Sequence, residues 1–265
     1  MTSSFFTVDD VDGSEWFRPT DACRGPWSAD ACHAGPPTGL LARAAERLLP
    51  EQRLIRLTVD LVRPIPHAGF SVTAEVSRGG RTVSTTSLAI VDADGKQVVT
   101  ASSMHVAPGP HFHLPTTEYD TPVFADAVAG RFPIEGGAHD LPMFATGVDV
   151  RYPPGEGPEP GPTRMWMRAL PLLPDEPSSG FQRICPLADC GNAVSRNSEV
   201  GDVAFMNTDL TILLHRDPVG EWFGMDSVSR WEPHGHGMSD SLLFDEHGPV
   251  GRALQTLLVQ PALPG

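Results

Sequence analysis

The sequence has few basic residues, and it contains neither a long apolar run nor a segment like a secretory leader. It has 19 lysines and arginines against 33 aspartates and glutamates, for a formal net charge of −14. This balance disfavours non-specific binding to nucleic acid or to an anionic membrane surface. No run approaches the roughly 18 apolar residues that cross a bilayer, and the opening MTSSFFTVDDVDG is unlike a secretory leader. We therefore expect a cytoplasmic protein with no nucleic-acid or membrane partner.

Motifs for metals, nucleotides and covalent catalysis are also missing. The 4 cysteines, at positions 23, 32, 185 and 190, have no zinc-site spacing and no secretory context for disulfides. There is no G-x-S-x-G elbow, no P-loop and no G-x-G-x-x-G after a strand. No Cys-His signature activates Cys190 as a nucleophile. We expect reduced, packed thiols and no metal or cofactor.

The chain is long enough for one large domain or for two of about 130 residues. With 265 residues, 40% of them hydrophobic, it can form a packed core. The same order of elements occurs twice. A helix over 36–49 precedes a strand over 53–64 and three strands over 69–106. A helix beginning near 190 precedes a strand over 203–218 and three strands over 221–260.

Short matches at a nearly constant offset support this duplication. VSR occurs at 76–78 and 228–230, and SLAIVDADG at 87–95 corresponds to SLLFDEHG at 241–248, an offset of about 152–154 residues. Residues 5–8 and 143–152 are candidates for a strand before each helix, with 163–170 as an extra strand in the second half. We predict an N-terminal unit over 1–106, a connector rich in proline and glycine over 107–140, and a C-terminal unit over 141–265.

Each unit is an α+β arrangement in which an antiparallel sheet curls around one helix. The two units are expected to pair as a pseudo-dimer whose edge strands join into one sheet. Three segments, HAGPPTGLLARA, NTDLTILLHR and ALQTLLV, resemble the acyl-CoA thioesterase II family in its double-hotdog form. The resemblance covers most of residues 15–106 and 141–260. It implies hydrolysis of an acyl-CoA substrate, and double-hotdog chains of this kind often form further homo-oligomers.

The resemblance also implies a water-orienting triad of Asp, Ser or Thr, and Gln in the second unit. The acid corresponds to Asp189 and the amide to Gln255. The hydroxyl position corresponds to Asn207, with Thr208 one residue on. Because alternate residues of a regular strand face opposite sides, Asn207 and Thr208 are alternatives for the third group.

The chemistry of the residues fits thioester hydrolysis, which needs a base for water and donors for the developing oxyanion. Asp189 at a helix start is a candidate base, although an aspartate there is also an ordinary N-cap. Exposed N–H groups near Gly191 and Asn192, and near Gly35 in the first unit, are candidate oxyanion or substrate donors.

The first unit differs from the second at the corresponding positions. His33 corresponds to Asp189 and Ser103 to Gln255, so the first unit is expected to supply a wall of the site, with His33 as a partly exposed turn residue. Two alternatives remain open. One is a non-catalytic acyl-CoA or lipid-binding protein on the same fold. The other is an enoyl-CoA hydratase, for which no Asp-x-Asn-Pro-x-His-like motif is present.

Overall fold

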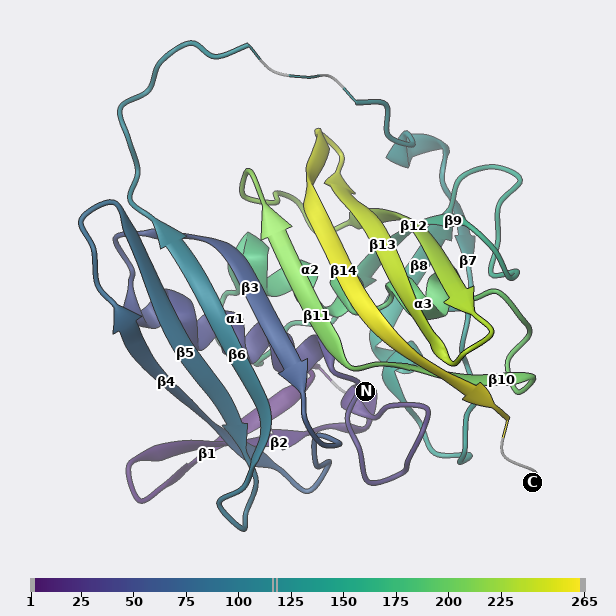
Figure 1. The fold of residues 1–265 in the computed structure, drawn as a ribbon, viewed down its shortest axis with the longest axis horizontal. Coiled ribbons are helices and arrows are strands. Elements are labelled where there is room, and N and C mark those ends of the chain that lie inside the picture. Colours follow the sequence, from purple (N-terminus) through teal and green to yellow (C-terminus); the bar gives the residue numbers. More distant parts are fainter. Residues whose placement is uncertain (1–2, 116, 118, 263–265) are drawn as a thin grey trace.

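The chain forms one long antiparallel sheet with its helices on one side (Figure 1). The computed structural model describes residues 3–115, 117 and 119–262. Within them, no helix is long and apolar enough to cross a membrane. The first unit contains β1 (Phe6–Val11), β2 (Ser14–Pro19), η1 (Asp21–Cys23), α1 (Gly35–Leu48), β3 (Arg53–Leu61), β4 (Phe70–Arg78), β5 (Val83–Val91) and β6 (Gln97–Val106).

The second unit repeats this plan with one extra strand, β7, on its outer edge and a short extra strand, β10, beside β14. It contains η2 (Phe124–Asp126), β7 (Val128–Gly130), η3 (Phe144–Gly147), β8 (Val148–Tyr152), β9 (Thr163–Ala169), α2 (Gly180–Ala188), α3 (Gly191–Val194), β10 (Val203–Asn207), β11 (Asp209–Leu214), β12 (Phe223–Glu232), β13 (His236–Asp245) and β14 (Gly248–Pro261). The described strands run in the order β1-β2-β4-β5-β6-β3-β11-β14-β13-β12-β9-β8-β7, and β10 pairs with β14.

The two units join where β3 pairs with β11, in the middle of Figure 1. Thr58 lies opposite Thr211 in the register, and their hydroxyl oxygens are 3.2 Å apart. These two threonines are 153 residues apart in the sequence, which is the offset of the repeat. An approximate two-fold axis therefore passes through this pair, and the predicted joining of edge strands is confirmed.

Helix α1 begins at Gly35, with prolines in its first turn, where a missing N–H costs no hydrogen bond. The Thr38 hydroxyl donates to the Ala34 carbonyl at 2.9 Å. Most of the helix is buried because it packs on the sheet with one face and on α2 with another. At Gly39, a Cβ would lie 3.2 Å from the Gln182 carbonyl oxygen, so the missing side chain allows the two helices to approach closely.

The predicted helix start near Cys190 is that of the one-turn helix α3, and the longer helix of the second unit lies before it. Helix α2 begins at Gly180, where the Ser179 hydroxyl accepts from the Gln182 N–H at 3.1 Å as an N-cap. The helix continues through Pro186 to Ala188, and the one-turn helix α3 follows at Gly191. A proline inside a helix removes one backbone hydrogen bond. No helix is predicted over 180–188 from the sequence, and a proline ordinarily indicates a helix boundary.

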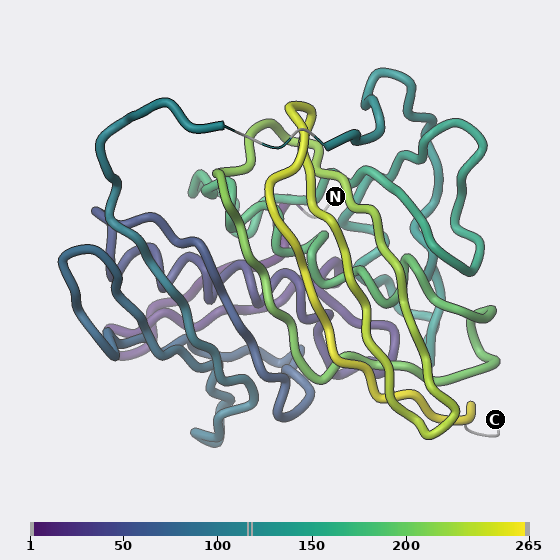
Figure 2. Tube along the Cα trace, turned by 45° about the horizontal axis from the view of Figure 1, so that its top comes forward, coloured from purple at the N-terminus to yellow at the C-terminus, as the bar shows by residue number. Residues whose placement is uncertain are grey.

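Other elements also differ from the expected ones. The start of the chain forms a hairpin, β1–β2, whose turn at Asp12-Gly13 has φ values of 54° and 80°. That Asp-Gly pair is a typical hairpin turn. The predicted strand over 203–218 is divided at Thr208 into β10 and β11. Residues 107–140, predicted as a connector, contain η2 and β7, and the described residues between β6 and η2 lie along the top of the molecule (Figures 1 and 2).

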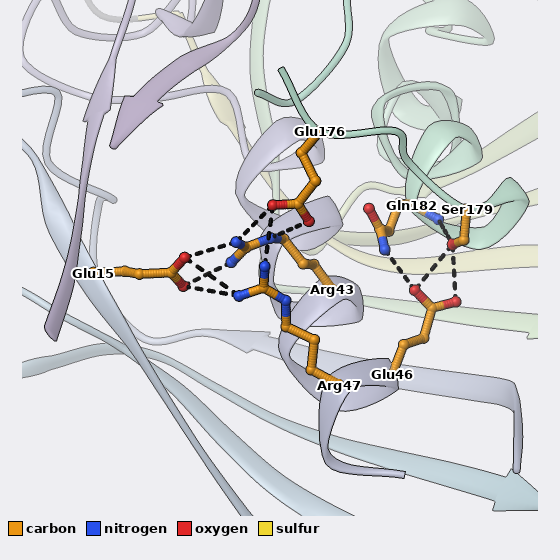
Figure 3. A network of polar contacts seen from close by, with 7 residues as sticks. All are labelled: Glu15, Arg43, Glu46, Arg47, Glu176, Ser179 and Gln182. Atoms are coloured by element: carbon orange, nitrogen blue, oxygen red, sulfur yellow. Dashed lines mark hydrogen bonds and ion pairs between the residues drawn. The ribbon is translucent and has the colours of Figure 1, made fainter. Parts of the chain in front are cut away.

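A polar network ties α1 to the segment that leads into α2 (Figure 3). The Arg43 guanidinium, only 5% exposed, lies 2.7 Å from carboxylate oxygens of both Glu15 and Glu176. One turn on, the Glu46 carboxylate accepts from the Ser179 hydroxyl at 2.8 Å and from the Gln182 side chain at 2.6 Å. These contacts fix the two helices relative to each other and so position the point where their ends meet.

Candidate active site

Asp189 lies where the helices of the two units meet. It follows α2 directly, its backbone N–H donates to the Cys185 carbonyl, and its side chain is 3% exposed. The start of α1 packs on this point: a Cβ at Gly35 would lie 2.9 Å from the Pro186 Cα and 3.2 Å from the Asp189 Cβ. A larger residue at position 35 would push the first unit away from the carboxyl group.

Two side-chain amides converge on one carboxyl oxygen. The Asn207 Nδ2 donates to Asp189 Oδ1 at 2.8 Å, and the Gln255 Nε2 lies 3.2 Å from the same oxygen. Gln255 also donates to the Asp189 backbone carbonyl at 3.0 Å, and its Oε1 accepts from the Asn192 N–H at 3.0 Å. The amide of Gln255 is therefore held in one orientation, with its nitrogen toward the acid.

The break between β10 and β11 separates the two candidates for the third group. Asn207, the last residue of β10, points to Asp189. Thr208 is exposed, and its hydroxyl lies 3.4 Å from the Thr256 carbonyl. Both residues line the cavity described below. Asn207, however, is the one in hydrogen-bond contact with the acid.

Burial raises the pKa of Asp189 from 3.8 to about 7, because a charged carboxylate is poorly solvated inside the protein. Hydrogen bonds oppose this shift and lower the pKa, in the order Asn207, the Gly35 backbone, Gln255 and the Ala34 backbone. The outcome is a carboxyl group that exchanges a proton near neutral pH, which is the range in which a general base is most effective.

His33, expected as a partly exposed turn residue, contacts the acid directly. Its Nδ1 lies 3.1 Å from Asp189 Oδ2, and its side chain is 11% exposed. Burial lowers the pKa of His33 to about 3, so the ring is neutral at ordinary pH. The repeat contained the signal for this contact, because His33 corresponds to Asp189, and equivalent residues near a two-fold axis meet one another.

An apolar cavity of about 440 Å³ adjoins Asp189 and is lined by both units and by the residues between them. Part of its lining is well exposed, with Trp27 at 44% and Val62 at 52%. Another part is buried, with Phe132 at 6% and Ile134 at 3%. We take the exposed part as the mouth and the buried part as the inner end.

The three predicted backbone donors are arranged differently from one another. Asn192 lines the cavity, but its backbone N–H is already bonded to Gln255. The Gly35 N–H donates to His33 Nδ1 at 3.1 Å. Gly191 is buried against β13, where a Cβ would lie 2.6 Å from the Ser241 hydroxyl oxygen. Of these residues, Asn192 is the one that lines the cavity, and its side-chain amide has no hydrogen-bond partner within the described part of the chain.

The cysteine beside the acid is a packing residue. The Cys190 Sγ lies 3.1 Å from the Pro186 carbonyl oxygen, and the side chain is fully buried. Burial, with a smaller effect from the Asp189 charge, raises the pKa of the Cys190 thiol well above its usual value. A thiol held protonated in this way is a poor nucleophile.

Two family models cover most of the chain. Residues 23–106 match the acyl-CoA thioesterase N-terminal domain, and residues 121–259 match the acyl-CoA thioesterase C-terminal domain. No curated protein matches the chain.

Solved structures of the same architecture cover the chain almost completely. A candidate thioesterase from Novosphingobium aromaticivorans shares 19% identity over 98% of this chain and 99% of its own, with a TM-score of 0.74. An acyl-CoA thioesterase II, TesB2, from Mycobacterium marinum shares 16% identity over 96% of each chain, with a TM-score of 0.68. A hot dog-fold protein of unknown function from Alicyclobacillus acidocaldarius shares 18% identity over 97% of this chain and 96% of its own, with a TM-score of 0.67. At these identities the likeness establishes the fold, and the double hotdog is confirmed.

Proposed function

Because this chain belongs to the acyl-CoA thioesterase family, and is thus a thioester hydrolase, we propose that it hydrolyses acyl-CoA with a water held by Asp189, Asn207 and Gln255. One observation carries the assignment of these residues. The carboxyl group of Asp189, with a near-neutral pKa, lies with Asn207 at the wall of an apolar cavity, and the amides of Asn207 and Gln255 converge on one of its oxygens. That arrangement supplies a base together with groups that fix its geometry.

In this mechanism the ionised Asp189 removes a proton from the water as the oxygen attacks the thioester carbonyl carbon. The carbonyl oxygen becomes an oxyanion, for which the side-chain amide of Asn192, a residue that lines the cavity, is the proposed donor. When the intermediate collapses, the C–S bond breaks and the thiolate takes up the proton that Asp189 holds. The products are the free acid and CoA, and Asp189 is ionised again.

The lining of the cavity indicates the kind of acyl group that fits. Apart from Asp189, the charged residue in the described lining is Arg63, which is exposed at the mouth. The inner end is formed by Phe132, Ile134 and Met143, all buried. A charged acyl group would lose its hydration there without gaining a partner. We therefore propose uncharged, apolar acyl groups that enter from the mouth.

The cavity volume limits the size of that group. A cavity of roughly 150 Å³ holds one benzene molecule, so the observed 440 Å³ has room for about three such groups. The acyl group shares this space with the end of the pantetheine arm that carries the thioester. The expected substrates therefore have acyl groups of moderate size.

The test compares acyl-CoA turnover, measured as thiol release, in the wild type and three variants. Asp189→Ala is expected to lower kcat by about 10²–10⁴-fold, the usual contribution of a positioned base. Asn207→Ala is expected to lower it by a smaller factor. Thr208→Ala is the matched control from the next position and is expected to remain near the wild-type rate.

The outcomes separate the competing functions. Equal turnover by the wild type and Asp189→Ala would remove the catalytic assignment. Binding of CoA esters in calorimetry without thiol release would instead support the non-catalytic acyl-CoA-binding alternative. Loss of activity in Thr208→Ala but not in Asn207→Ala would exchange their roles.

A further inference from the structure

The imidazole of His33 is held rigidly across the boundary between the units. Its ring stacks on Phe144 with centroids 3.9 Å apart and planes 10° apart. Its backbone N–H donates to the Cys23 carbonyl at 2.8 Å. Phe144 is in turn packed edge-on against Phe132, with centroids 5.4 Å apart. The position of the ring nitrogens relative to Asp189 is therefore fixed by packing.

The contacts of His33 Nδ1 raise the question of whether the proton between Nδ1 and Asp189 Oδ2 belongs to the ring or to the carboxyl group. Nδ1 accepts from the Gly35 N–H at 3.1 Å, and it also lies 3.1 Å from Asp189 Oδ2. Two lone pairs at that distance repel each other unless one of the atoms carries hydrogen. Either Asp189 is protonated and donates to Nδ1, or the ring carries its proton on Nδ1 and donates to the carboxylate.

We propose that His33 and Asp189 share one proton across the unit boundary, with the imidazole changing tautomer as Asp189 changes its ionisation state. When Asp189 is protonated, its hydroxyl and the Gly35 N–H share the single lone pair of Nδ1, and the ring proton is on Nε2. When Asp189 is ionised, the ring proton is on Nδ1 and donates to Oδ2, and the Gly35 N–H, which a protonated Nδ1 cannot accept, donates to the Asp189 carboxylate. The effect of this pair on catalysis rests on the proposed function. In that function His33 is a positioning residue that acts through Asp189.

Among the described groups that face Asp189, His33 is the one that can both donate a proton to the carboxyl group and accept one from it. From α2 and its end, the thiols of Cys185 and Cys190 face the acid, and burial raises the pKa of both, so they are uncharged. From β10 and β14, the facing groups are the amides of Asn207 and Gln255. From the start of α1 and the residues just before it, besides His33, they are the backbone N–H groups of Ala34 and Gly35.

The remaining ring nitrogen has access to the medium that the exchange requires. His33 lines the cavity, and its Nε2 has no hydrogen-bond partner within the described part of the chain. Protons can therefore be gained or lost at Nε2 through the cavity while Nδ1 stays against the acid. Asp189 is both ionised and protonated during each turnover. The His33 ring can donate a hydrogen bond to its carboxylate form and accept one from its acid form, so it can stabilise both states.

Three variants separate this role from others. In His33→Asn, the side-chain amide reaches the position of Nδ1 and can donate or accept. In His33→Gln, the amide reaches the position of Nε2. In His33→Leu, neither position carries a polar atom. All three lose the ring that stacks on Phe144, so differences among them report hydrogen bonding and not packing.

The expected readout is the pH profile of kcat/KM. Hydrogen bonds to charged groups are stronger than those to neutral groups, so losing the Nδ1–H donor raises the pKa of Asp189. The acidic limb in His33→Leu and His33→Gln should therefore move up by about one pH unit, whereas His33→Asn keeps it near that of the wild type. An unchanged limb in His33→Leu overturns the proposal. So does a complete loss of activity in a folded His33→Asn, which would make Nε2 itself the base.

A measurement without turnover keeps the inference independent of the proposed function. In protein with ¹⁵N-labelled histidine, the His33 ring signals are identified by their absence in His33→Asn. We expect a neutral ring that changes from the Nε2–H to the Nδ1–H tautomer as the pH rises through the ionisation of Asp189, and a fixed tautomer in Asp189→Asn. A wild-type tautomer that stays constant from pH 5 to 9 refutes the pair. A tautomer change in a protein that hydrolyses no thioester refutes only the proposed function.

Discussion

Replacing Asp189 by asparagine is expected to change stability in a way that depends on pH. Burial raises the pKa of the folded-state carboxyl from 3.8 to about 7. Between these values the unfolded chain ionises Asp189 while the folded chain keeps it protonated. Below the unfolded-state pKa, Asp189 therefore does not lower the free energy of unfolding. As the pH rises from the unfolded-state pKa to the folded-state pKa, the free energy of unfolding decreases. A shift of roughly three pKa units corresponds to about 4 kcal/mol in full.

The assay is urea unfolding of the wild type and Asp189→Asn at pH 5 and at pH 8. Most of the pH-dependent loss falls in this interval, so the free energy of unfolding of the variant, relative to the wild type, is expected to rise by about 2–3 kcal/mol. Asparagine also loses bonds from the backbone N–H groups of Ala34 and Gly35, but that loss is the same at both pH values.

The control is Asp94→Asn, because the Asp94 side chain is 76% exposed. Its stability relative to the wild type is expected to stay constant over the same interval. If the difference between Asp189→Asn and the wild type is equally constant, Asp189 ionises normally in the folded protein. The reasoning that makes it a near-neutral base would then be refuted.

Three further substitutions test the packing around the site. Gly35→Ala places a Cβ 2.9 Å from the Pro186 backbone and should cost about 1–3 kcal/mol in urea unfolding, with a loss of turnover as α1 moves from the acid. Arg43→Met leaves Glu176 without its buried partner. It should cost about 1–2 kcal/mol after allowance for solvent screening. Because Arg43 lowers the pKa of Glu176, that cost should diminish as the pH falls and the carboxyl is protonated. Phe132→Ala enlarges the inner end of the cavity and should raise kcat/KM for longer acyl chains, relative to shorter ones, by several-fold.

Each of these has a matched control on the same chain. A Cβ at Gly109 meets nothing within 4 Å, so Gly109→Ala should leave stability unchanged. Arg47, with its side chain 53% exposed, provides Arg47→Met as the exposed counterpart of the buried arginine. Phe112 is 64% exposed, and Phe112→Ala should not alter chain-length preference. Equal effects in a variant and its control would contradict the corresponding prediction.

The overall architecture could be predicted because duplication leaves a regular trace in the sequence. The offset of about 152–154 residues identified two units, and the pairing of Thr58 with Thr211 shows that this offset is also the spatial symmetry. Helix α2 was not predicted, and Pro186 lies inside it. In isolation a proline indicates a helix boundary, whereas here the packing of α2 against α1 outweighs the missing hydrogen bond.

The candidate site was predicted in part. The resemblance identified Asp189, Asn207 and Gln255, and these side chains lie in contact. The fact that Asn207 contacts the acid, and that Thr208 does not, depends on the break between β10 and β11, which in turn depends on long-range pairing with β14. The raised pKa of Asp189 depends on burial by both units at once, so no local pattern contains it.

The contact between His33 and Asp189 shows what a fused chain allows and a symmetric dimer does not. In a dimer of identical units, residues next to the two-fold axis face their own copies, so the pair would be two acids or two imidazoles. After duplication the two positions are free to differ, and here one is an acid and the other an imidazole, 3.1 Å apart.

The same freedom accounts for a single candidate site. Gln255 contacts Asp189, whereas its counterpart Ser103 is completely buried between Thr86 and His105, at 2.6 and 2.8 Å. In the first unit, the polar side chains at this position therefore hydrogen-bond to one another within the sheet. What it still gives to the shared cavity is the start of α1 and the imidazole of His33.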